Sequence, residues 1–387
     1  MTLTPSRRRP RNSGTQIGPA AGIKGRGASF NTPNRFETLH LEPIDVNSDP
    51  ASGSGDGRPK TVFYKDTSKS VLSKNDSPDI PFTYSLNPYR GCEHGCIYCY
   101  ARPSHEYLGF SAGVDFESKI MVKHDAPGLL EAAFKSSKWE PQMVSLSGNT
   151  DCYQPVERKL ELTRRCLEVF LKFRNPVGIV TKNALVTRDI DILKELASLN
   201  LAIVSVSVTS LDGDLIKRME PRTSAPYKRL ETIQTLAEAG IPVSVMVAPV
   251  IPGLTDEEIP SILKEAAARG ASSASYTILR LPGPVEPLFL DWLERELPER
   301  SSRVINRIRD LRGGKLSESR WGKRMKGEGE IARAIKQLFD VNRRKLGLDT
   351  RKFEFATSHF RREPEGQLGL FDQTLNRINI TSPSSTT

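Results

Sequence analysis

The amino-acid sequence predicts an α/β fold organised around a parallel sheet. Between Pro81 and about residue 283, short apolar segments rich in β-branched residues alternate with segments whose apolar residues recur at helical spacing. The apolar segments are typical of strands that are covered on both faces, as in a parallel sheet. This pattern fits an open doubly wound sheet or a full or partial barrel, and in each of these folds the chemistry takes place at the carboxyl ends of the strands.

The elements follow one another in a regular order along this region. Strands are expected at 84–89, 119–122, 143–148, 177–182, 201–209, 243–251 and 273–281. Helices are expected between them at 128–136, 158–173, 189–199, 225–240 and 257–270. Gly240 and Gly270 end two of these helices, because glycine readily adopts the left-handed conformation found at a helix C-terminus.

Regions of different composition flank this α/β region, which we place at 79–285. Residues 1–78 are rich in Ser, Gly, Pro and charge and are predicted to form a mostly disordered N-terminal segment. Helices are expected at 287–297, 303–313 and 329–347, within a basic helical C-terminal extension at 286–362 that precedes a flexible tail at 363–387. Residues 300–362 hold 19 Lys and Arg against 7 Asp and Glu, a balance of +12. Such a surface is typical either of a solvated face or of a protein that attracts a polyanion, most simply nucleic acid.

Composition also indicates where the protein works. The chain has five cysteines, three of them clustered, which does not make a paired disulfide framework, and no secretory signal is recognisable at the N-terminus. Its apolar runs are far shorter than the ~20 residues that a membrane span needs. We therefore expect a soluble, cytoplasmic protein without a membrane segment.

The stretch NPYRGCEHGCIYCYARPSHEY at 87–107 contains three cysteines in one loop, Cys92, Cys96 and Cys99. Thiolates at such spacing select soft metals or iron–sulfur clusters. A structural zinc would need a fourth ligand, for which His94, His105 and Cys152 are the candidates. A [4Fe-4S] cluster can instead be held by three thiolates, which leaves one iron open to another ligand.

The C-x3-C-x2-C spacing, with Tyr98 directly before the last cysteine, resembles the signature of the radical S-adenosylmethionine (SAM) enzymes, and the resemblance extends over roughly residues 80–285. It implies a partial (βα)6 TIM-type barrel and a [4Fe-4S] cluster whose open iron binds SAM. The implied reaction is reductive cleavage of SAM to a 5′-deoxyadenosyl radical, with electrons from a donor such as flavodoxin or ferredoxin. The cysteine loop and the segment EPRTS at 220–224 resemble the spore photoproduct lyase-like group, which includes uncharacterised bacterial proteins.

The resemblance also implies which residues bind SAM. Tyr98 would lie beside the adenine, Asp151 would meet the amino group, and Lys182 would neutralise the carboxylate. Asp151 has the alternative role of capping the next helix. The other candidates are Ser207, Thr209, Glu220 and Arg222.

The last four candidates have structural alternatives. Ser207 and Thr209 lie on the same face of a strand and could instead be hydroxyls that fill the sheet. Glu220 and Arg222 could instead form an ion pair with each other. Cys152 departs from the pattern of spore photoproduct lyase, in which the hydrogen-donating cysteine precedes the corresponding Asp, so it is either a displaced hydrogen donor or a small buried hydrophobe.

The pentapeptide QLGLF in the tail resembles the motif with which bacterial DNA polymerases and repair proteins bind the sliding clamp. Its anchors would be Gln367, Leu368, Leu370 and Phe371, unless the segment folds back onto the barrel. The sequence thus predicts a radical SAM enzyme that acts on nucleic acid, in DNA repair or modification. The alternatives are a protein, tRNA or small-molecule substrate, or a DNA-associated metal-binding module without radical chemistry.

Overall fold

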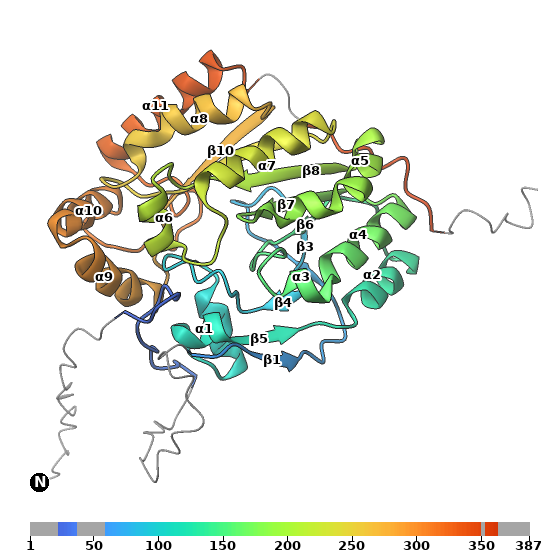
Figure 1. Cartoon of the computed structure of the whole chain (residues 1–387), viewed down its shortest axis with the longest axis horizontal. Coiled ribbons are helices and arrows are strands. Elements are labelled where there is room, and N and C mark those ends of the chain that lie inside the picture. The colour runs from blue at the N-terminus through green and yellow to red at the C-terminus, as the bar shows by residue number, and fades with distance from the viewer. Residues whose placement is uncertain (1–21, 37–58, 350–352, 363–387) are drawn as a thin grey trace, which may run out of the picture.

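The computed structural model describes residues 22–36, 59–349 and 353–362. Within these residues the main sheet has seven strands in the order β10-β9-β8-β7-β6-β3-β2, and the first six of them pair in parallel (Figure 1). The parallel strands are β3 (Tyr84–Leu86), β6 (Val144–Leu146), β7 (Val177–Thr181), β8 (Ala202–Ser207), β9 (Val243–Val250) and β10 (Ser273–Ile278). β2 (Leu72–Lys74) pairs antiparallel with β3 at one edge. The prediction of a mostly parallel α/β fold is confirmed.

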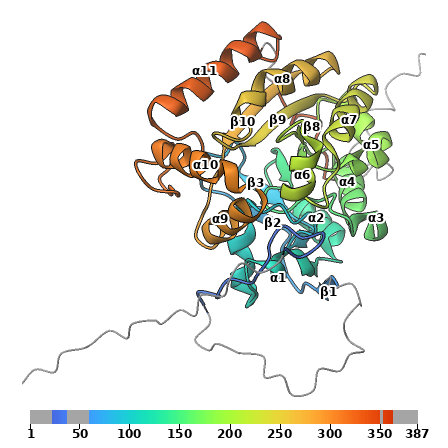
Figure 2. The ribbon, with the colours of Figure 1, turned by 60° about the vertical axis from the view of Figure 1, so that its left-hand side comes forward.

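Helices follow the parallel strands and lie around the outside of the sheet (Figures 1 and 2). They are α2 (Ala126–Lys135), α3 (Glu157–Leu160), α4 (Leu162–Phe173), α5 (Ile190–Ser198), α6 (Gly213–Met219), α7 (Pro226–Glu238) and α8 (Ile259–Ala268). Shorter turns are α1 (Val114–Ser118) and the 3₁₀ helices η1 (Arg102–Leu108), η2 (Ala184–Asp189) and η3 (Asp256–Glu258).

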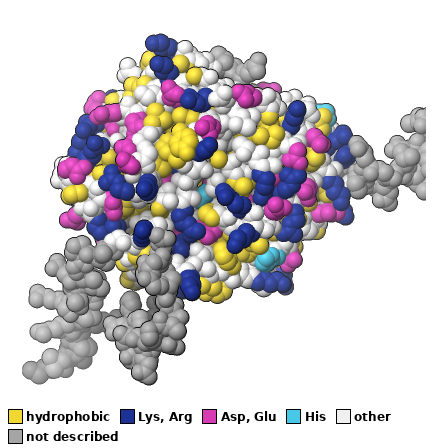
Figure 3. Space-filling model, in the orientation of Figure 1, with side chains coloured by type: hydrophobic (Ala, Val, Ile, Leu, Met, Phe, Trp, Pro, Cys, Tyr) yellow, Lys and Arg dark blue, Asp and Glu magenta, His cyan; other side chains and the backbone are white. Residues whose placement is uncertain are grey.

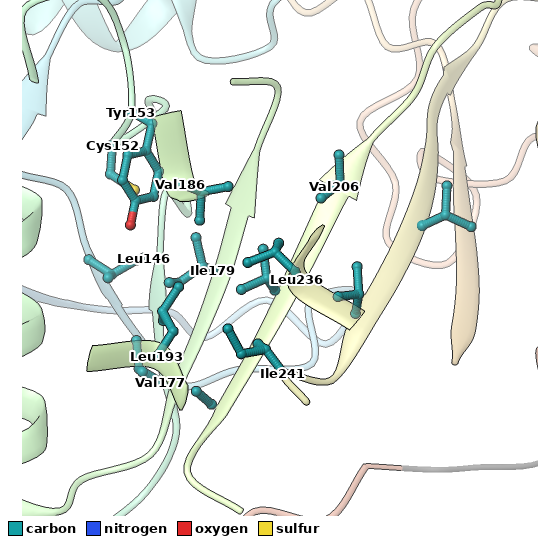
Figure 4. Close-up of a cluster of buried hydrophobic side chains, with 14 of the residues drawn as sticks. Leu146, Cys152, Tyr153, Val177, Ile179, Val186, Leu193, Val206, Leu236 and Ile241 are labelled. Atoms are coloured by element: carbon teal, nitrogen blue, oxygen red, sulfur yellow. The ribbon is translucent and has the colours of Figure 1, made fainter. Parts of the chain in front are cut away.

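The core lies between the sheet and these helices. Aliphatic side chains of β6, β7, β8 and β9 are almost completely buried against apolar side chains of α4, α5 and α7. Figure 4 shows part of this cluster, in which Cys152 and Tyr153 lie with Leu146 and Val186. The even burial of these strands explains why their sequences are apolar on both faces.

The N-terminal segment differs from its prediction. Residues 62–65 form β1 (Val62–Lys65), which pairs in parallel with β5 (Lys119–Val122) in a three-stranded sheet completed by β4 (Tyr89–Arg90). Residues 22–36 pack on the cysteine loop. The prediction of a mostly disordered segment over 1–78 did not identify these ordered parts, because polar, Gly-rich composition does not reveal hydrogen bonds made to distant residues.

The basic extension contains the three expected helices, α9 (Val285–Glu296), α10 (Pro298–Leu311) and α11 (Gly329–Lys345), beside β10 and α8 (Figures 1 and 2). Many of its cations have acidic partners, among them the ion pairs Arg303–Glu257, Arg307–Asp256, Lys323–Glu328 and Lys336–Asp340. Figure 3 shows this mixture of Lys, Arg, Asp and Glu on one face of the molecule. The extension therefore does not present an unbroken basic surface there.

The segment between α10 and α11 joins the two edges of the main sheet. The Ile278 N–H of β10 donates to the Met325 carbonyl (3.0 Å), while Arg324 pairs with Asp79 (2.7 Å), which precedes β3. The gap between β10 and the β2–β3 edge is thus spanned by residues of the extension. No helix within the described ranges has the length and apolar character that crossing a bilayer demands.

Candidate active site at the cysteine loop

The cysteine loop follows β4 and is shaped by two glycines in the left-handed region. Gly91 has φ 78° and Gly95 has φ 67°, so both positions favour glycine. The Cys92 N–H donates to the Phe116 carbonyl (2.9 Å), which ties the loop to α1. A Cβ on Gly27 would lie 2.0 Å from the Gly95 carbonyl oxygen, which is too close for any side chain. The backbone of the N-terminal segment therefore packs directly against the backbone of the cysteine loop at this position.

A buried ion pair between Arg102 and Glu117 holds the cysteine loop in place. Arg102 and Glu117 are both 0% exposed in their side chains and form an ion pair. The Arg102 guanidinium also donates to the carbonyls of Cys96 (2.9 Å), Ala112 (3.0 Å) and Gly113 (2.9 Å). The Glu117 carboxylate accepts the Gly27 and Ala28 N–H groups at 3.1 and 2.9 Å. Loop, α1 and N-terminal segment are therefore held by one fully paired charge network.

The three thiols fit a cluster that carries positive charge. Cys92 and Cys96 are buried and Cys99 is partly buried. Burial, with Cys92 nearby, raises the pKa of the Cys99 thiol to about 11, and burial raises that of Cys96 well above its usual value. Thiolates here need a cation, which iron supplies. Within the described residues no three His, Cys, Asp or Glu side chains gather as the ligands of a single ion. Three thiols in one loop are a donor set that a [4Fe-4S] cluster accepts, whereas a structural zinc takes four protein ligands.

Five candidate residues meet at the carboxyl ends of the strands, and we call them the Lys182 cluster: Tyr98, Lys182, Ser207, Thr209 and Glu220. The Lys182 Nζ donates to Ser207 Oγ (2.7 Å), Thr209 Oγ1 (3.0 Å) and the Ala248 carbonyl (2.9 Å). It lies 3.4 Å from Glu220 Oε1 and 5.7 Å from the centroid of the Tyr98 ring. Because Tyr98 is adjacent to Cys99, the cluster lies beside the cysteine loop.

Charge in the Lys182 cluster is arranged around Glu220. Its carboxylate accepts hydrogen bonds from Thr209 (2.7 Å), from the Tyr98 hydroxyl and from the buried Arg229. Burial raises the pKa of Glu220, although Arg229 opposes this effect. Burial lowers the pKa of Lys182 to about 7, and the like charge of Arg229 adds to it. A further anion close to Lys182 would favour its charged form.

Asp151 is already bound by the protein. Its carboxylate accepts the Thr181 hydroxyl (2.9 Å), the Lys182 N–H (2.8 Å) and the Tyr153 N–H (2.9 Å), and it lies 3.4 Å from the His94 ring. These bonds hold the end of β7 against the loop after β6. Burial tends to lower the pKa of His94, but Asp151 and Cys92 raise it to about 10.

Arg222 lies apart from the Lys182 cluster. It pairs with Glu93 (3.1 Å), so the alternative that Glu220 and Arg222 form an ion pair is wrong. Arg222 lines two surface cavities, of ≈ 370 and ≈ 400 Å³, and its N–H donates to the His94 carbonyl (3.3 Å). Its role toward SAM stays a prediction.

Cys152 lies in the hydrophobic core and not at the mouth of the site. Its side chain is 0% exposed, and it belongs to the same hydrophobic cluster as Leu146, part of which Figure 4 shows. Burial raises the pKa of its thiol well above the usual range. This burial favours the alternative of a small buried hydrophobe, and the role of hydrogen donor stays a prediction. The anchors Gln367, Leu368, Leu370 and Phe371 lie outside the described residues.

The sequence did not single out several residues that shape the site. Arg102 and Glu117 hold the loop, Arg229 binds Glu220, and Glu93 binds Arg222. Arg229 lies in α7, where its spacing looks like that of any amphipathic helix. Only the fold, which turns this side chain inward, identifies it.

Comparison with known proteins assigns the chain to a family. A profile of the radical SAM superfamily matches residues 86–266. An uncharacterized protein of Mycobacterium tuberculosis is 37% identical over 253 residues, which are 65% of this chain and 73% of that protein. The chain belongs to the radical SAM superfamily of enzymes, whose cofactors are a [4Fe-4S] cluster and SAM.

Two further similarities concern proteins whose activities are known by name. Spore photoproduct lyase complexed with a dinucleoside spore photoproduct has a TM-score of 0.52 and 18% identity, covering 73% of this chain and 79% of that one. This likeness shows a shared fold. A radical SAM Nα-GlyT isomerase of Pseudomonas phage M6 is 22% identical over 283 residues, which are 71% of this chain and 56% of that protein.

Proposed function

We propose that the protein binds SAM at the Lys182 cluster and acts on nucleic acid, in DNA repair or DNA modification. The observation that carries the proposal is the position of this cluster beside three cysteines at the carboxyl ends of parallel strands. Such ends are where α/β enzymes hold their ligands. Membership of the superfamily defines the reaction class. In this proposal the Lys182 cluster is the site where this chain binds SAM for that reaction.

The protein's own residues have distinct tasks in this proposal. Lys182 provides the cation for the SAM carboxylate, and the hydroxyls of Ser207 and Thr209 that now accept from its Nζ can turn toward the cofactor. Glu220 positions Tyr98 and Lys182 together. Because Thr209 and Glu220 are 0% and 1% exposed, the cluster is largely closed to water. When bound, the iron–sulfur cluster and SAM supply a 5′-deoxyadenosyl radical that abstracts hydrogen from a substrate.

Two lines support a nucleic-acid substrate. The fold is shared with spore photoproduct lyase, which was solved with a dinucleoside lesion. The chain itself has a formal net charge of +10, which favours polyanions. The acidic partners of several cations in the C-terminal extension favour the second candidate, a protein or small-molecule substrate. A steep loss of DNA binding with rising salt is expected if phosphates are contacted, and flat, weak binding would favour the second candidate.

Activity can be tested with anaerobically reconstituted protein. It should hold about four irons per chain and form 5′-deoxyadenosine with SAM and dithionite. Deuterium should move into 5′-deoxyadenosine from labelled damaged oligonucleotides. The Cys96→Ala variant should lose the product, whereas Cys166→Ala, which removes a buried core thiol, should retain it. A Cys96→Ala protein that still forms 5′-deoxyadenosine would sink the proposal.

A further inference from the structure

Arg280 stands at the end of β10 without an acidic partner. Among the described residues its hydrogen bond is a weak one, from Nη1 to the Met325 sulfur (3.6 Å). Its Nε is buried and has no acceptor there. A guanidinium normally satisfies its donors with carboxylates or carbonyls, since a buried unpaired donor destabilises the fold. Arg280 therefore has an unused pair of donors, Nε and Nη2, on one edge.

The surroundings of Arg280 hold more positive than negative charge. Arg312 and Arg324 lie near it, and burial together with Arg324 lowers the pKa of Arg280. Asp79 is the nearby carboxylate, but Arg324 Nε and the Gly322 N–H bind it at 2.7 and 2.6 Å. Arg324 thus binds Asp79, the carboxylate that acts on Arg280, while the carboxylate that acts on Arg312 is Glu318. Among the described residues, no carboxylate forms an ion pair with Arg280, so a bound anion there would be stabilised.

Arg280 also faces the cysteine loop. Its Cζ lies 5.7 Å from the centroid of the Tyr100 ring, and Tyr100 directly follows Cys99. The Tyr100 hydroxyl donates to the Gly148 carbonyl (2.7 Å), just after β6, so the ring reaches from the β6 side to the β10 side of the site. Its ring is 47% exposed. Tyr98 belongs to the Lys182 cluster, while Tyr100, on the other side of Cys99 in sequence, contacts Arg280.

We propose that Arg280 binds a backbone phosphate of a single-stranded or unstacked polynucleotide at the mouth of the site. The inference rests on the proposed function and adds the residue that recognises the substrate. The planar fork of Nε and Nη2 matches two phosphate oxygens. The exposed Tyr100 ring beside it offers a stacking surface for a base. A phosphate there supplies Arg280 with the charged hydrogen-bond acceptor that Asp79, which is bound by Arg324 and the Gly322 N–H, does not provide.

Binding of a fluorescein-labelled oligothymidylate to the reconstituted protein tests the inference, read by fluorescence anisotropy. Arg280→Gln should raise Kd about tenfold, the loss of one charged hydrogen-bonded contact, and should lower the salt slope by about 0.7. The control is Arg333→Gln, which removes an exposed, paired arginine of α11 and should change Kd by less than about twofold. Thymidylyl-thymidine should compete in the wild type better than thymidine or inorganic phosphate.

Folding is checked separately. Because Arg280 has no acidic partner and lies near two other cations, Arg280→Gln should unfold at the same temperature as the wild type or a higher one. Arg280→Lys keeps the charge but loses the fork, so it should bind more weakly than wild type and more tightly than Arg280→Gln. Equal binding by the Arg280→Gln and Arg333→Gln variants would overturn the inference. Formation of 5′-deoxyadenosine by the wild type is measured in parallel, so a failure of the proposed function is seen apart from a failure at Arg280.

Discussion

The carboxylate of Glu220 binds Tyr98, Thr209 and Arg229 in a region from which water is excluded. Glu220 forms its main ion pair with Arg229 and lies 3.4 Å from Lys182. Glu220 therefore positions Lys182 without fully neutralising the positive charge of Lys182. A cofactor carboxylate could then compete for Lys182. In this proposal Glu220 and Arg229 form a fixed ion pair, and Lys182 is the cation that can change its anionic partner.

Replacement of Lys182 tests this division. Lys182→Met should raise the Kd for SAM at least about tenfold, because a charged hydrogen bond to the carboxylate is lost. Isothermal titration of the reconstituted protein measures the change. Lys228→Met, at an exposed lysine paired with Glu231, should leave the Kd unchanged. Equal affinity in both variants would mean that Lys182 has only a structural role.

His105 makes stability depend on pH. Its ring is 0% exposed and packs on Phe110 and Phe116, and burial lowers its pKa to about 4, opposed in part by Asp115. Between pH 6.5 and pH 4 the unfolded chain therefore binds a proton that the folded one does not. The folded state should lose about 2 kcal/mol between pH 7 and pH 5 through this residue.

The measurement is urea unfolding of wild type and His105→Phe at both pH values. The variant should lack this part of the pH dependence, whereas His124→Gln should keep it. An unchanged pH dependence in His105→Phe would show that folding does not lower the pKa of His105.

Sequence reasoning found the residues whose position is encoded locally. Cys92, Cys96 and Cys99 share one loop, and Lys182, Ser207 and Thr209 follow strands. Arg229 and Arg102 could not be found in this way, because their partners are distant in the chain and their own spacing is that of ordinary surface arginines. Cys152 was open to two interpretations, and its burial in the core supports that of a small buried hydrophobe.

At the scale of elements, the cysteine loop depends on its neighbours α1 and residues 22–36. Arg102 and Glu117 join these pieces through five backbone groups. None of the three pieces is long enough to be stable alone. Their mutual order therefore comes from buried charge and hydrogen bonding.

Arg102→Met should destabilise the fold by about 3 kcal/mol, because it leaves the Glu117 carboxylate buried and unpaired. It should also lower the iron content per chain after reconstitution. Arg165→Met, at an exposed position of α4, should change stability by less than about 0.5 kcal/mol. Denaturant unfolding and iron analysis measure both effects, and normal stability in Arg102→Met would contradict the assigned role.

Element prediction failed where the backbone departs from local preference. The expected helix 158–173 is two helices, because Glu161 adopts a left-handed conformation with φ 51°. A glutamate is a good helix former, so the break has no local signal. β1 was missed because its partner, β5, lies more than 50 residues away.

At the scale of the molecule, the C-terminal extension joins the two edges of the sheet. Arg324 reaches Asp79 and Ser77 near the β2–β3 edge, while Met325 accepts from Ile278 of β10. The extension therefore connects the two edge regions of the main sheet. At least one of its basic residues, Arg324, thus has a structural role in the contact with Asp79, in addition to any attraction of the extension to polyanions.

Arg324→Met should weaken the connection that the C-terminal extension makes between the two edges of the sheet. The amide of Ile278 should exchange with solvent about tenfold faster, because the segment that covers it loses its charged anchor. Hydrogen exchange followed by mass spectrometry measures this, with Arg320→Met as the control at a 62% exposed arginine. Unaltered exchange at Ile278 would show that the Met325 contact persists without the anchor.

The hydrogen bonds that Gly27 and Ala28 donate to Glu117 also bear on where the chain can be cut. The residues that match the family profile, 86–266, contain Glu117 but neither its two backbone donors nor β10. A chain trimmed to the matched residues would leave a carboxylate uncovered at one end and the apolar edge of β9 unpaired at the other. Such an edge invites pairing between copies. Fragments of this protein made for laboratory work should therefore keep residues from 22 through the segment that carries Met325.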